Sequence, residues 1–313
     1  MGQDRAVSAV VLVDASACRE LDAVAGLLAG ALGVPTVRVS AAELSTTTLT
    51  MELGTGVLTV GDRRVRPTVA WVRHAGAPAL WAYTGNGFDL RSWSSFLDQI
   101  AAVAAVTLPG REPGHVDQLV DAERRGVSVP RTTVTTDPAA SALRRAASVT
   151  TVKAVGPHFA EDAEPYPAEI VGRRDEPPAW ARGRTPVIVQ QYVPHARELR
   201  VYYLDGAVCS FDVRKKAPSA IWFDPGDVAV TRTRTSRAVA KLVHRLATAW
   251  GLRYGAFDLL ETPGGDLVFL EVNADGDWIW FEGRAAWPGG VTFLAAAMVN
   301  DLHTHALRER AAA

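Results

Sequence analysis

The stretch Tyr254-Gly-Ala-Phe-Asp258-Leu-Leu-Glu-Thr-Pro-Gly-Gly-Asp-Leu-Val-Phe-Leu-Glu271-Val-Asn273 predicts two antiparallel strands joined by a tight turn at Pro-Gly-Gly. Because side chains alternate along a strand, Glu271 and Asn273 face the same side, and Asp258 lies on the neighbouring strand. Two carboxylates and an amide are ligands that Mg²⁺ accepts. Acidic residues beside a hairpin are also common on surfaces, but polar side chains ending so apolar a strand need partners. The stretch therefore predicts a magnesium site.

Composition sets the broad class of the protein. The chain has 313 residues, of which 48% are hydrophobic and 21% charged, so it can bury a substantial core, and its length suggests two or three subdomains. A formal net charge of -1 gives no overall field for nucleic acid or membrane. The apolar windows are shorter than the roughly 20 residues of a membrane span. Cys18 and Cys209 are the only cysteines, which favours a reducing cytoplasm.

The first third of the chain predicts an α/β unit. Ala6 to Asp14 is typical of a buried strand followed by a helix, but no Gly-x-Gly-x-x-Gly follows, so the dinucleotide-binding fingerprint is absent. The other elements expected here are a helix over 16–32, a strand over 34–39, a hairpin formed by 46–60 and 63–72 with Gly61-Asp62 at its turn, and a helix over 90–106. Pro109-Gly110 and Pro113-Gly114 indicate a boundary after this unit.

Arg73 and His74 follow the last strand of that unit. Two interpretations remain open at this point: the pair contacts a substrate, or it only closes the end of the strand. An extended ribbon over 46–72 can likewise offer an edge to a peptide or serve as an ordinary supporting sheet.

The middle of the chain predicts a helix over 117–125, a strand over 127–134, a helix over 138–147 and a strand over 149–153. Lys153 ends the last of these strands, where an ammonium group needs an anion, and a phosphate supplies one. A lysine at a strand end is also often simply solvated.

A polar linker follows a buried strand over 186–190. Its residues Gln190-Gln191-Tyr192-Val193 expose backbone groups that can pair with the edge of a purine between apolar neighbours. The segment from Glu198 to Arg214 then predicts a hairpin with Asp205-Gly206 at the turn, and 235–250 predicts an amphipathic helix before the magnesium hairpin.

The order of these parts resembles the ATP-grasp superfamily, over most of the chain. In detail it is most similar to graspetide (microviridin-type) peptide macrocyclases and next to ribosomal-protein glutamate ligases. The motifs that carry the resemblance are Pro130-Arg-Thr, Gln190-Gln-Tyr-Val-Pro followed by Glu198-Leu-Arg, and Glu271-Val-Asn-Ala-Asp-Gly-Asp-Trp278-Ile-Trp-Phe-Glu282. The last of these is the most specific.

The resemblance implies roles for individual residues in binding ATP and Mg²⁺. Lys153 would hold the α- and β-phosphates, Gln190 and the adjoining linker Gln191, Tyr192 and Val193 the adenine, and Glu198 the ribose; Arg214 would lie near the γ-phosphate and, with Arg200, serve catalysis; Asp258, Glu271 and Asn273 would hold magnesium; Arg73 and His74 would line the substrate side. The reaction implied is transfer of the γ-phosphoryl group to a carboxylate, followed by attack of an amine or hydroxyl on the acylphosphate.

Two positions depart from the pattern of the family. His115 stands where a second phosphate-binding lysine is usual, and neutral imidazole lacks the fixed charge of an ammonium. Ala220-Ile-Trp222-Phe-Asp224 replaces the Asp-Trp-Arg of many macrocyclases, which puts the acceptor chemistry in question. The segment 156–162 has few glycines, which favours the peptide-modifying branch over the dipeptide ligases.

The sequence thus predicts an α/β ATP-grasp fold with an N-terminal α/β domain (1–110), a central lid subdomain (111–185) and a C-terminal antiparallel-sheet subdomain with the metal clamp (186–313). The expected function is an ATP-dependent carboxylate–amine or carboxylate–hydroxyl ligase acting on a ribosomally made precursor peptide. The alternatives are a ligase for free amino acids or small molecules and a nucleotide-binding module without chemistry. The expected partners include no nucleic acid and no membrane. Whether the protein forms a homodimer, and whether Trp278 to Trp287 are core or interface, stays open.

Overall fold

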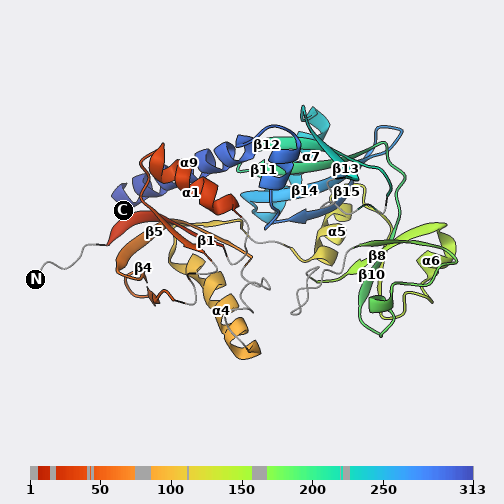
Figure 1. Cartoon of the computed structure of the whole chain (residues 1–313), viewed down its shortest axis with the longest axis horizontal. Coiled ribbons are helices and arrows are strands. Elements are labelled where there is room, and N and C mark those ends of the chain that lie inside the picture. The colour runs from red at the N-terminus through yellow and green to blue at the C-terminus, as the bar shows by residue number, and fades with distance from the viewer. Residues whose placement is uncertain are drawn as a thin grey trace, which may run out of the picture.

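The computed structural model of the chain describes residues 6–14, 19–40, 43, 46–74, 86–110, 113–156, 168–218, 220 and 226–312. Within these residues the strands form three sheets of six, four and five strands, which we call the N-terminal, central and C-terminal sheets (Figure 1). The long helix α9 (Gly290–Ala312) contacts strands of both the N-terminal and the C-terminal sheet.

The N-terminal sheet has the order β2-β1-β5-β4-β3, and β6 also pairs with β5, farther along the strand than β4. Its strands are β1 (Val7–Asp14), β2 (Thr36–Ser40), β3 (Leu49–Glu52), β4 (Val57–Val60), β5 (Arg63–Arg73) and β6 (Val106–Leu108). The strand over 46–60 that the sequence suggests is two strands, β3 and β4, paired with each other. The predicted turn at Gly61-Asp62 is confirmed, because β4 and β5 pair on either side of it.

The helices of this part begin and end at recognisable signals. Helix α1 (Glu20–Gly30) follows β1, as expected for a βα unit. Helix α4 (Gly87–Ile100) begins at Asn86, whose side chain accepts hydrogen bonds from the next two free backbone N–H groups. The prediction that this helix extends to 106 is wrong: it ends at Ile100, passes into a 3-10 turn (Ala101–Val103), and leads into β6, which pairs with β5.

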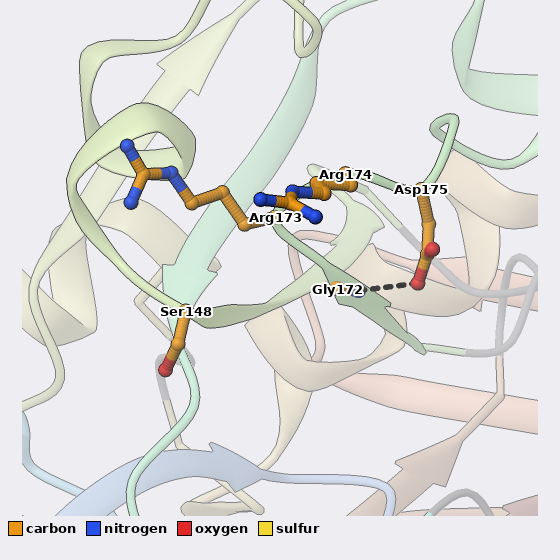
Figure 2. A pocket seen from close by; sticks show the side chains of 5 residues that line it. All are labelled: Ser148, Gly172, Arg173, Arg174 and Asp175. Carbon is orange, nitrogen blue, oxygen red and sulfur yellow. Dashed lines mark hydrogen bonds between the residues drawn. The ribbon is translucent and has the colours of Figure 1, made fainter.

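The central sheet has the order β7-β10-β8-β9, with strands β7 (Thr132–Thr135), β8 (Val149–Ala154), β9 (Glu169–Gly172) and β10 (Val187–Gln191). Helix α6 (Ala142–Ala146) and a 3-10 turn (Ala179–Ala181) pack on it. Strand β10 lies beyond residue 185 but pairs with β7 and β8, so the central sheet continues past that expected boundary. A cavity of about 520 Å³ lined by Ser148, Arg173 and Arg174 lies at the end of β8 far from Lys153 (Figure 2).

The C-terminal sheet is antiparallel, with the order β13-β12-β11-β14-β15. Its strands are β11 (Arg197–Leu204), β12 (Ala207–Lys215), β13 (Val228–Thr233), β14 (Tyr254–Glu261) and β15 (Leu267–Asn273). The helices around it, besides α9, are α5 (His115–Arg124), α7 (Arg237–Trp250) and α8 (Ile279–Arg284). Both predicted hairpins, at Asp205-Gly206 and at 262–266, are confirmed.

The two faces of the C-terminal sheet differ in chemistry. One face, which we call the α7 face, carries Leu199, Val201 and Phe257 and packs under helix α7. Helix α7 begins at Ser236, whose side chain accepts the N–H of Val239. The opposite face, which we call the site face, carries Arg200, Asp258 and Glu271, which pair directly across neighbouring strands, and Glu198, which lies two residues from Arg200 on the same strand.

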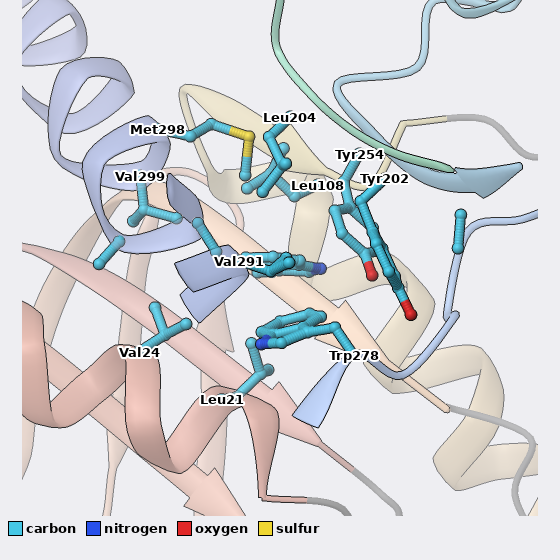
Figure 3. Close-up of a cluster of buried hydrophobic side chains, with 14 of the residues drawn as sticks. Leu21, Val24, Leu108, Tyr202, Leu204, Tyr254, Trp278, Val291, Met298 and Val299 are labelled. Carbon is cyan, nitrogen blue, oxygen red and sulfur yellow. The ribbon is translucent and has the colours of Figure 1, made fainter. Parts of the chain in front are cut away.

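One hydrophobic core joins the N-terminal and C-terminal parts (Figure 3). Trp278, which follows β15, stacks on Trp71 of β5 with ring centroids 5.9 Å apart, and both contact Tyr254 of β14. All three rings are fully buried. Trp278 is therefore a core residue, and the shared core fixes the end of β5 against the segment that follows β15.

Among the helices of the described residues, none combines the length and the apolar character that crossing a membrane requires.

Candidate functional site

The predicted metal ligands lie together at the open end of the β14–β15 hairpin. Asp258 pairs directly with Glu271 across the two strands, and Asn273 pairs with Ala256, so all three side chains lie on the site face. A register shift after Asp258 compensates for the extra residue in β15. Asp258 is buried, Glu271 half-buried and Asn273 exposed, which forms a gradient from the sheet outward to solvent.

Two cations already contact these carboxylates. Arg200 of β11 donates from Nη1 to Oδ2 of Asp258 at 2.8 Å, and Lys153 of β8 donates from Nζ to Oε2 of Glu271 at 2.9 Å. The second ion pair joins the central sheet to the C-terminal sheet, since its two residues belong to different sheets. It places the strand-end lysine directly beside the predicted clamp.

The electrostatics at Asp258 indicate a site short of positive charge. Burial raises the pKa of Asp258 to about 7; the guanidinium of Arg200 opposes the shift, while the carboxylates of Glu271 and Glu198 add to it. Oδ1 of Asp258 is buried and accepts no hydrogen bond from any described residue. A buried carboxylate oxygen without a donor, beside two more carboxylates, is an environment that a divalent cation satisfies.

The donor set fits magnesium in kind. Two carboxylates and an amide oxygen are hard ligands, and a partly exposed clamp leaves room for the waters that Mg²⁺ retains. Among the described residues, no three His, Cys, Asp or Glu side chains are arranged to hold a metal ion by themselves. The predicted set has only two such side chains, and its third ligand is Asn273, whose Oδ1 accepts the N–H of Asp275 at 2.8 Å.

The predicted nucleotide-binding residues lie on and beside the central sheet. Lys153 pairs directly with Ile188 and Gln190 with Thr151, so Lys153 and Gln190 point to the same face. Gln190 is buried and donates to the Thr132 hydroxyl at 3.1 Å, which leaves its amide engaged inside the sheet.

The linker after β10 is half-buried. The N–H of Gln191 donates to Arg131 O at 2.8 Å, and the carbonyl of Val193 accepts from Nδ1 of His195 at 2.9 Å. Burial raises the pKa of Tyr192, and the carboxylate of Glu198 adds to the shift, so the linker lies near the β11 end of the site.

Glu198 has a partner that the sequence analysis did not single out. Lys215, at the end of β12, forms an ion pair with Glu198 at 3.1 Å, and its side chain is 18% exposed. Arg214, which was predicted to lie near the γ-phosphate, points to the α7 face, where it lies 3.6 Å from Asp212 and its side chain is 78% exposed. Strand alternation separates the two residues: Lys215 shares the face of Phe211 and Val213, and Arg214 does not.

His115 is the first residue of helix α5 and is half-buried. The helix is fixed to the metal-binding strand by Gln118, whose amide accepts the N–H of Val272 at 2.8 Å and donates to its carbonyl at 3.0 Å. This pairing replaces a strand partner at the edge of β15 and places the start of α5 beside the clamp.

Arg73 and His74 lie at the other side of the site. Arg73 is fully buried and donates through Nη2 to Oδ1 of Asp277 and to the carbonyl of Asp275, both at 2.6 Å. Its Nη1 lies 3.5 Å from Asp14 and 4.0 Å from Glu20. Such a guanidinium holds the segment 275–278 on the N-terminal sheet and is not accessible to a substrate in this arrangement. His74, with its side chain 21% exposed, also contacts Asp277.

The segment 274–278 rests directly on the site face. A Cβ at Gly276 would come within 2.5 Å of Arg200 Nη2, so only glycine permits this approach. The Tyr202 hydroxyl donates to the carbonyl of Asp277. Glu20 of α1 accepts the N–H groups of Trp278 and Ile279, both at 3.1 Å. Glu20 was not predicted as a site residue, because in the sequence it is only an isolated acidic residue within an expected helix.

Two segments that the comparison with the family pattern used lie outside the described residues. They are 157–162, which belongs to the stretch with few glycines, and 221–224, which belongs to the stretch that replaces Asp-Trp-Arg.

Neither a protein-family model nor a curated protein sequence matches the chain. Solved structures do. The macrocyclase MdnC of Microcystis aeruginosa MRC, bound with the precursor peptide MdnA, is 21% identical, with a TM-score of 0.72 over 93% of this chain and 99% of that one. The ATP-grasp ligase PsnB, complexed with a precursor variant, Mg and ADP, is 19% identical, with a TM-score of 0.73 over 95% and 100%.

A third similar structure comes from outside the peptide-modifying group. The D-alanyl-alanine synthetase A of Vibrio cholerae O1 biovar eltor is 11% identical, with a TM-score of 0.60 over 97% of this chain and 99% of that one. The three similarities cover nearly the whole length of each chain. The protein therefore has the α/β ATP-grasp fold, as the sequence predicted.

Proposed function

We propose that the protein is an ATP- and magnesium-dependent ligase that activates a carboxylate as an acylphosphate. The observation that carries this proposal is the ion pair between Lys153 and Glu271, which brings a buried lysine of the central sheet to the carboxylates of the C-terminal sheet. ATP between the two sheets would separate this pair, with its phosphates taking Glu271's place at Lys153 and a cation taking Lys153's place at Glu271.

The site residues then have defined roles. Asp258, Glu271 and Asn273 would hold magnesium, Lys153 would contact the phosphates, and Gln190 to Val193 with Glu198 would hold the nucleoside. When bound, magnesium supplies the positive charge that neutralises the transferring phosphoryl group. Arg200 is fixed by Asp258 and by the ring of Tyr202, 5.5 Å away, so its guanidinium is preorganised beside the reacting groups.

The substrate that the fold and site favour is a ribosomally made precursor peptide. The solved structures similar to this chain include MdnC with a precursor peptide and PsnB with a minimal precursor, Mg and ADP. By this proposal the chain joins a side-chain carboxylate of the peptide to a hydroxyl or amine side chain, forming an ester or amide. The partner is then a peptide, and the reaction takes place in the cytoplasm. The division into domains at 110 and 185 and a homodimer remain predictions.

The test is direct. Purified protein is incubated with ATP, MgCl₂ and synthetic peptides encoded by short acidic, Thr/Ser/Lys-rich reading frames next to its gene. Release of ADP together with loss of one water per new bond, read by mass spectrometry, supports the proposal. Release of ADP only with free amino acids identifies a small-molecule ligase instead. Binding of ATP without ADP release from either class of substrate contradicts a catalytic role.

A further inference from the structure

His74 has an unusual backbone conformation at the end of β5. Its φ is 53°, in the left-handed region that a side chain with a Cβ rarely adopts. The conformation is held because its N–H donates to Oδ2 of Asp275 at 2.9 Å. A strained residue held in place by neighbours is a common feature of sites where a side chain must be aimed.

The imidazole of His74 is oriented by a carboxylate. Its Nε2 donates to Oδ1 of Asp277 at 3.2 Å, and the same oxygen accepts from the buried guanidinium of Arg73 at 2.6 Å. Because Nε2 carries the proton that this hydrogen bond needs, the lone pair of the neutral ring is on Nδ1. Nδ1 makes no hydrogen bond with any described residue. It is also not one of the buried side-chain atoms that lack a hydrogen-bond partner. A ring nitrogen whose lone pair no described residue engages, opposite a carboxylate-bound one, is the arrangement of a proton acceptor.

The same segment places His74 beside the clamp. Asp275 contacts His74 through its carboxylate and Asn273 through its N–H. Gly276 lies against Arg200, and the Asp277 carbonyl accepts the Tyr202 hydroxyl. His74 is therefore connected to the metal-binding end of the site face through the segment 275–277. A ligase of the proposed kind also needs a base for the acceptor nucleophile.

The charged groups around His74 come from three elements. Asp275 and Asp277 follow β15, Arg73 precedes His74 on β5, and Asp98 of α4 interacts with Asp275. Burial acts to lower the pKa of His74, but the hydrogen bond to Asp277 and the carboxylates outweigh both burial and Arg73, so the pKa of His74 is raised above its ordinary value. The shift strengthens the imidazole as a base.

We propose that His74 is the general base that takes the proton from the acceptor hydroxyl or amine, with Asp277 as the positioning residue that orients the ring. The inference rests on the proposed ligase function. As the acceptor oxygen or nitrogen forms its bond to the acyl carbon, its proton passes to Nδ1. The carbon–oxygen bond to phosphate breaks, the electron pair leaves with inorganic phosphate, and the imidazolium returns its proton to water. An ammonium acceptor loses its first proton to water before it attacks.

The experiment separates formation of the acylphosphate from its capture. His74→Asn removes the base but keeps a residue that tolerates the left-handed conformation. Wild type and variant are given ATP, MgCl₂ and the synthetic peptide, with and without hydroxylamine. Hydroxylamine is largely unprotonated at neutral pH and captures acylphosphates without a general base. We expect His74→Asn to slow peptide crosslinking about 10²-fold relative to hydroxamate formation.

The control is His305→Asn, which replaces an exposed histidine on α9 and should change neither reaction. Wild-type crosslinking should rise with pH as His74 loses its proton, and the residual activity of His74→Asn should lack that rise. An equal fall in crosslinking and hydroxamate formation in His74→Asn, or an unchanged pH profile, would mean that His74 only supports the structure and would overturn the inference. If wild type forms neither hydroxamate nor ADP with any peptide, the proposed function itself fails, and this inference fails with it.

Discussion

The two faces of the C-terminal sheet are built from the same strands but bury different groups. The α7 face packs Leu199, Val201 and Phe257 under a helix, and its buried carboxylate Asp212 pairs with Arg197, whose side chain is 35% exposed. The site face buries Arg200 and Asp258 in its centre, with side chains 8% and 9% exposed. Buried charges cost free energy unless they are paired. Only the site face buries both partners of an ion pair in this comparison, and it sets them beside Glu271 and Glu198, which is an arrangement suited to chemistry on that face.

The comparison also shows that strand alternation, and not closeness in sequence, decides which face of the sheet a side chain occupies. Arg214 and Lys215 are neighbours in sequence, yet one points to exposed surface on the α7 face and the other is held by Glu198 on the site face. The same alternation makes Glu261 a counterpart of Glu271: each is a glutamate on the β14–β15 hairpin, but Glu261 pairs with Arg197 on the α7 face.

The largest effect is expected from Arg73, which connects the site face to the N-terminal sheet. Arg73→Met should lower the free energy of unfolding by about 3–5 kcal/mol, because it leaves Asp14 and Asp277 without their buried cation. Urea denaturation measures this change. Arg197→Met is the matched control: Arg197 contacts two carboxylates on the α7 face but is 35% exposed, so its loss should cost about 1 kcal/mol or less. Equal losses in the two variants would contradict the distinction between the faces.

Glu271→Gln tests the metal clamp with an isosteric change. ADP release at saturating ATP should fall about 10²- to 10³-fold, because the developing charge on the phosphoryl group loses part of its neutralisation. Raising the MgCl₂ concentration should restore part of the activity. Glu261→Gln, on the other face, should keep turnover within about twofold of wild type. The assignment of the clamp is wrong if Glu271→Gln retains full turnover at low and high magnesium alike.

The sequence was most informative where one local rule decides the outcome. Alternation along β15 placed Glu271 and Asn273 on one face, and the turn residues at Asp205-Gly206 and Gly61-Asp62 set both hairpins. The role expected for Arg214 rested instead on the family resemblance, which does not separate this residue from its neighbour Lys215. A single slip of one position in strand phase moves a side chain to the opposite face.

Contacts between distant segments could not be predicted from the sequence. The buried site at Arg73 needs Asp14, Glu20 and Asp277, which lie up to 263 positions apart in the chain and have no shared periodicity. The end of the helix at Ile100 was missed because Ala101 to Val106 continues an apolar, helix-compatible run, and pairing with β5 decides that Val106 is in a strand. Tertiary pairing overrode local preference there.

Separate substitutions of Arg214 and Lys215 test whether these two neighbouring residues lie on opposite faces of the sheet. Lys215→Ala should raise the KM for ATP about tenfold, because it releases Glu198 from its ion pair and removes a cation from the site face. Arg214→Ala should change kcat and KM by less than about twofold, since its side chain is 78% exposed and points away. Steady-state ADP release over a range of ATP concentrations gives both values. If only Arg214→Ala loses activity, Arg214 acts at the phosphates as the sequence predicted, and the assignment of Lys215 to the site face is wrong.

The smallest effect is expected on the α7 face. Ser236 accepts the N–H of Val239 at 3.2 Å and so begins helix α7, whose residues Val243 and Leu246 cover that face. Ser236→Ala should lower the free energy of unfolding by about 1 kcal/mol, with an unchanged dependence on urea, because one helix N–H loses its acceptor. Turnover at low temperature should stay at the wild-type level, since no group on the site face depends on this bond. A fall in ADP release larger than the loss of folded protein would show that α7 transmits its position through the sheet, and the two faces would then not be separable.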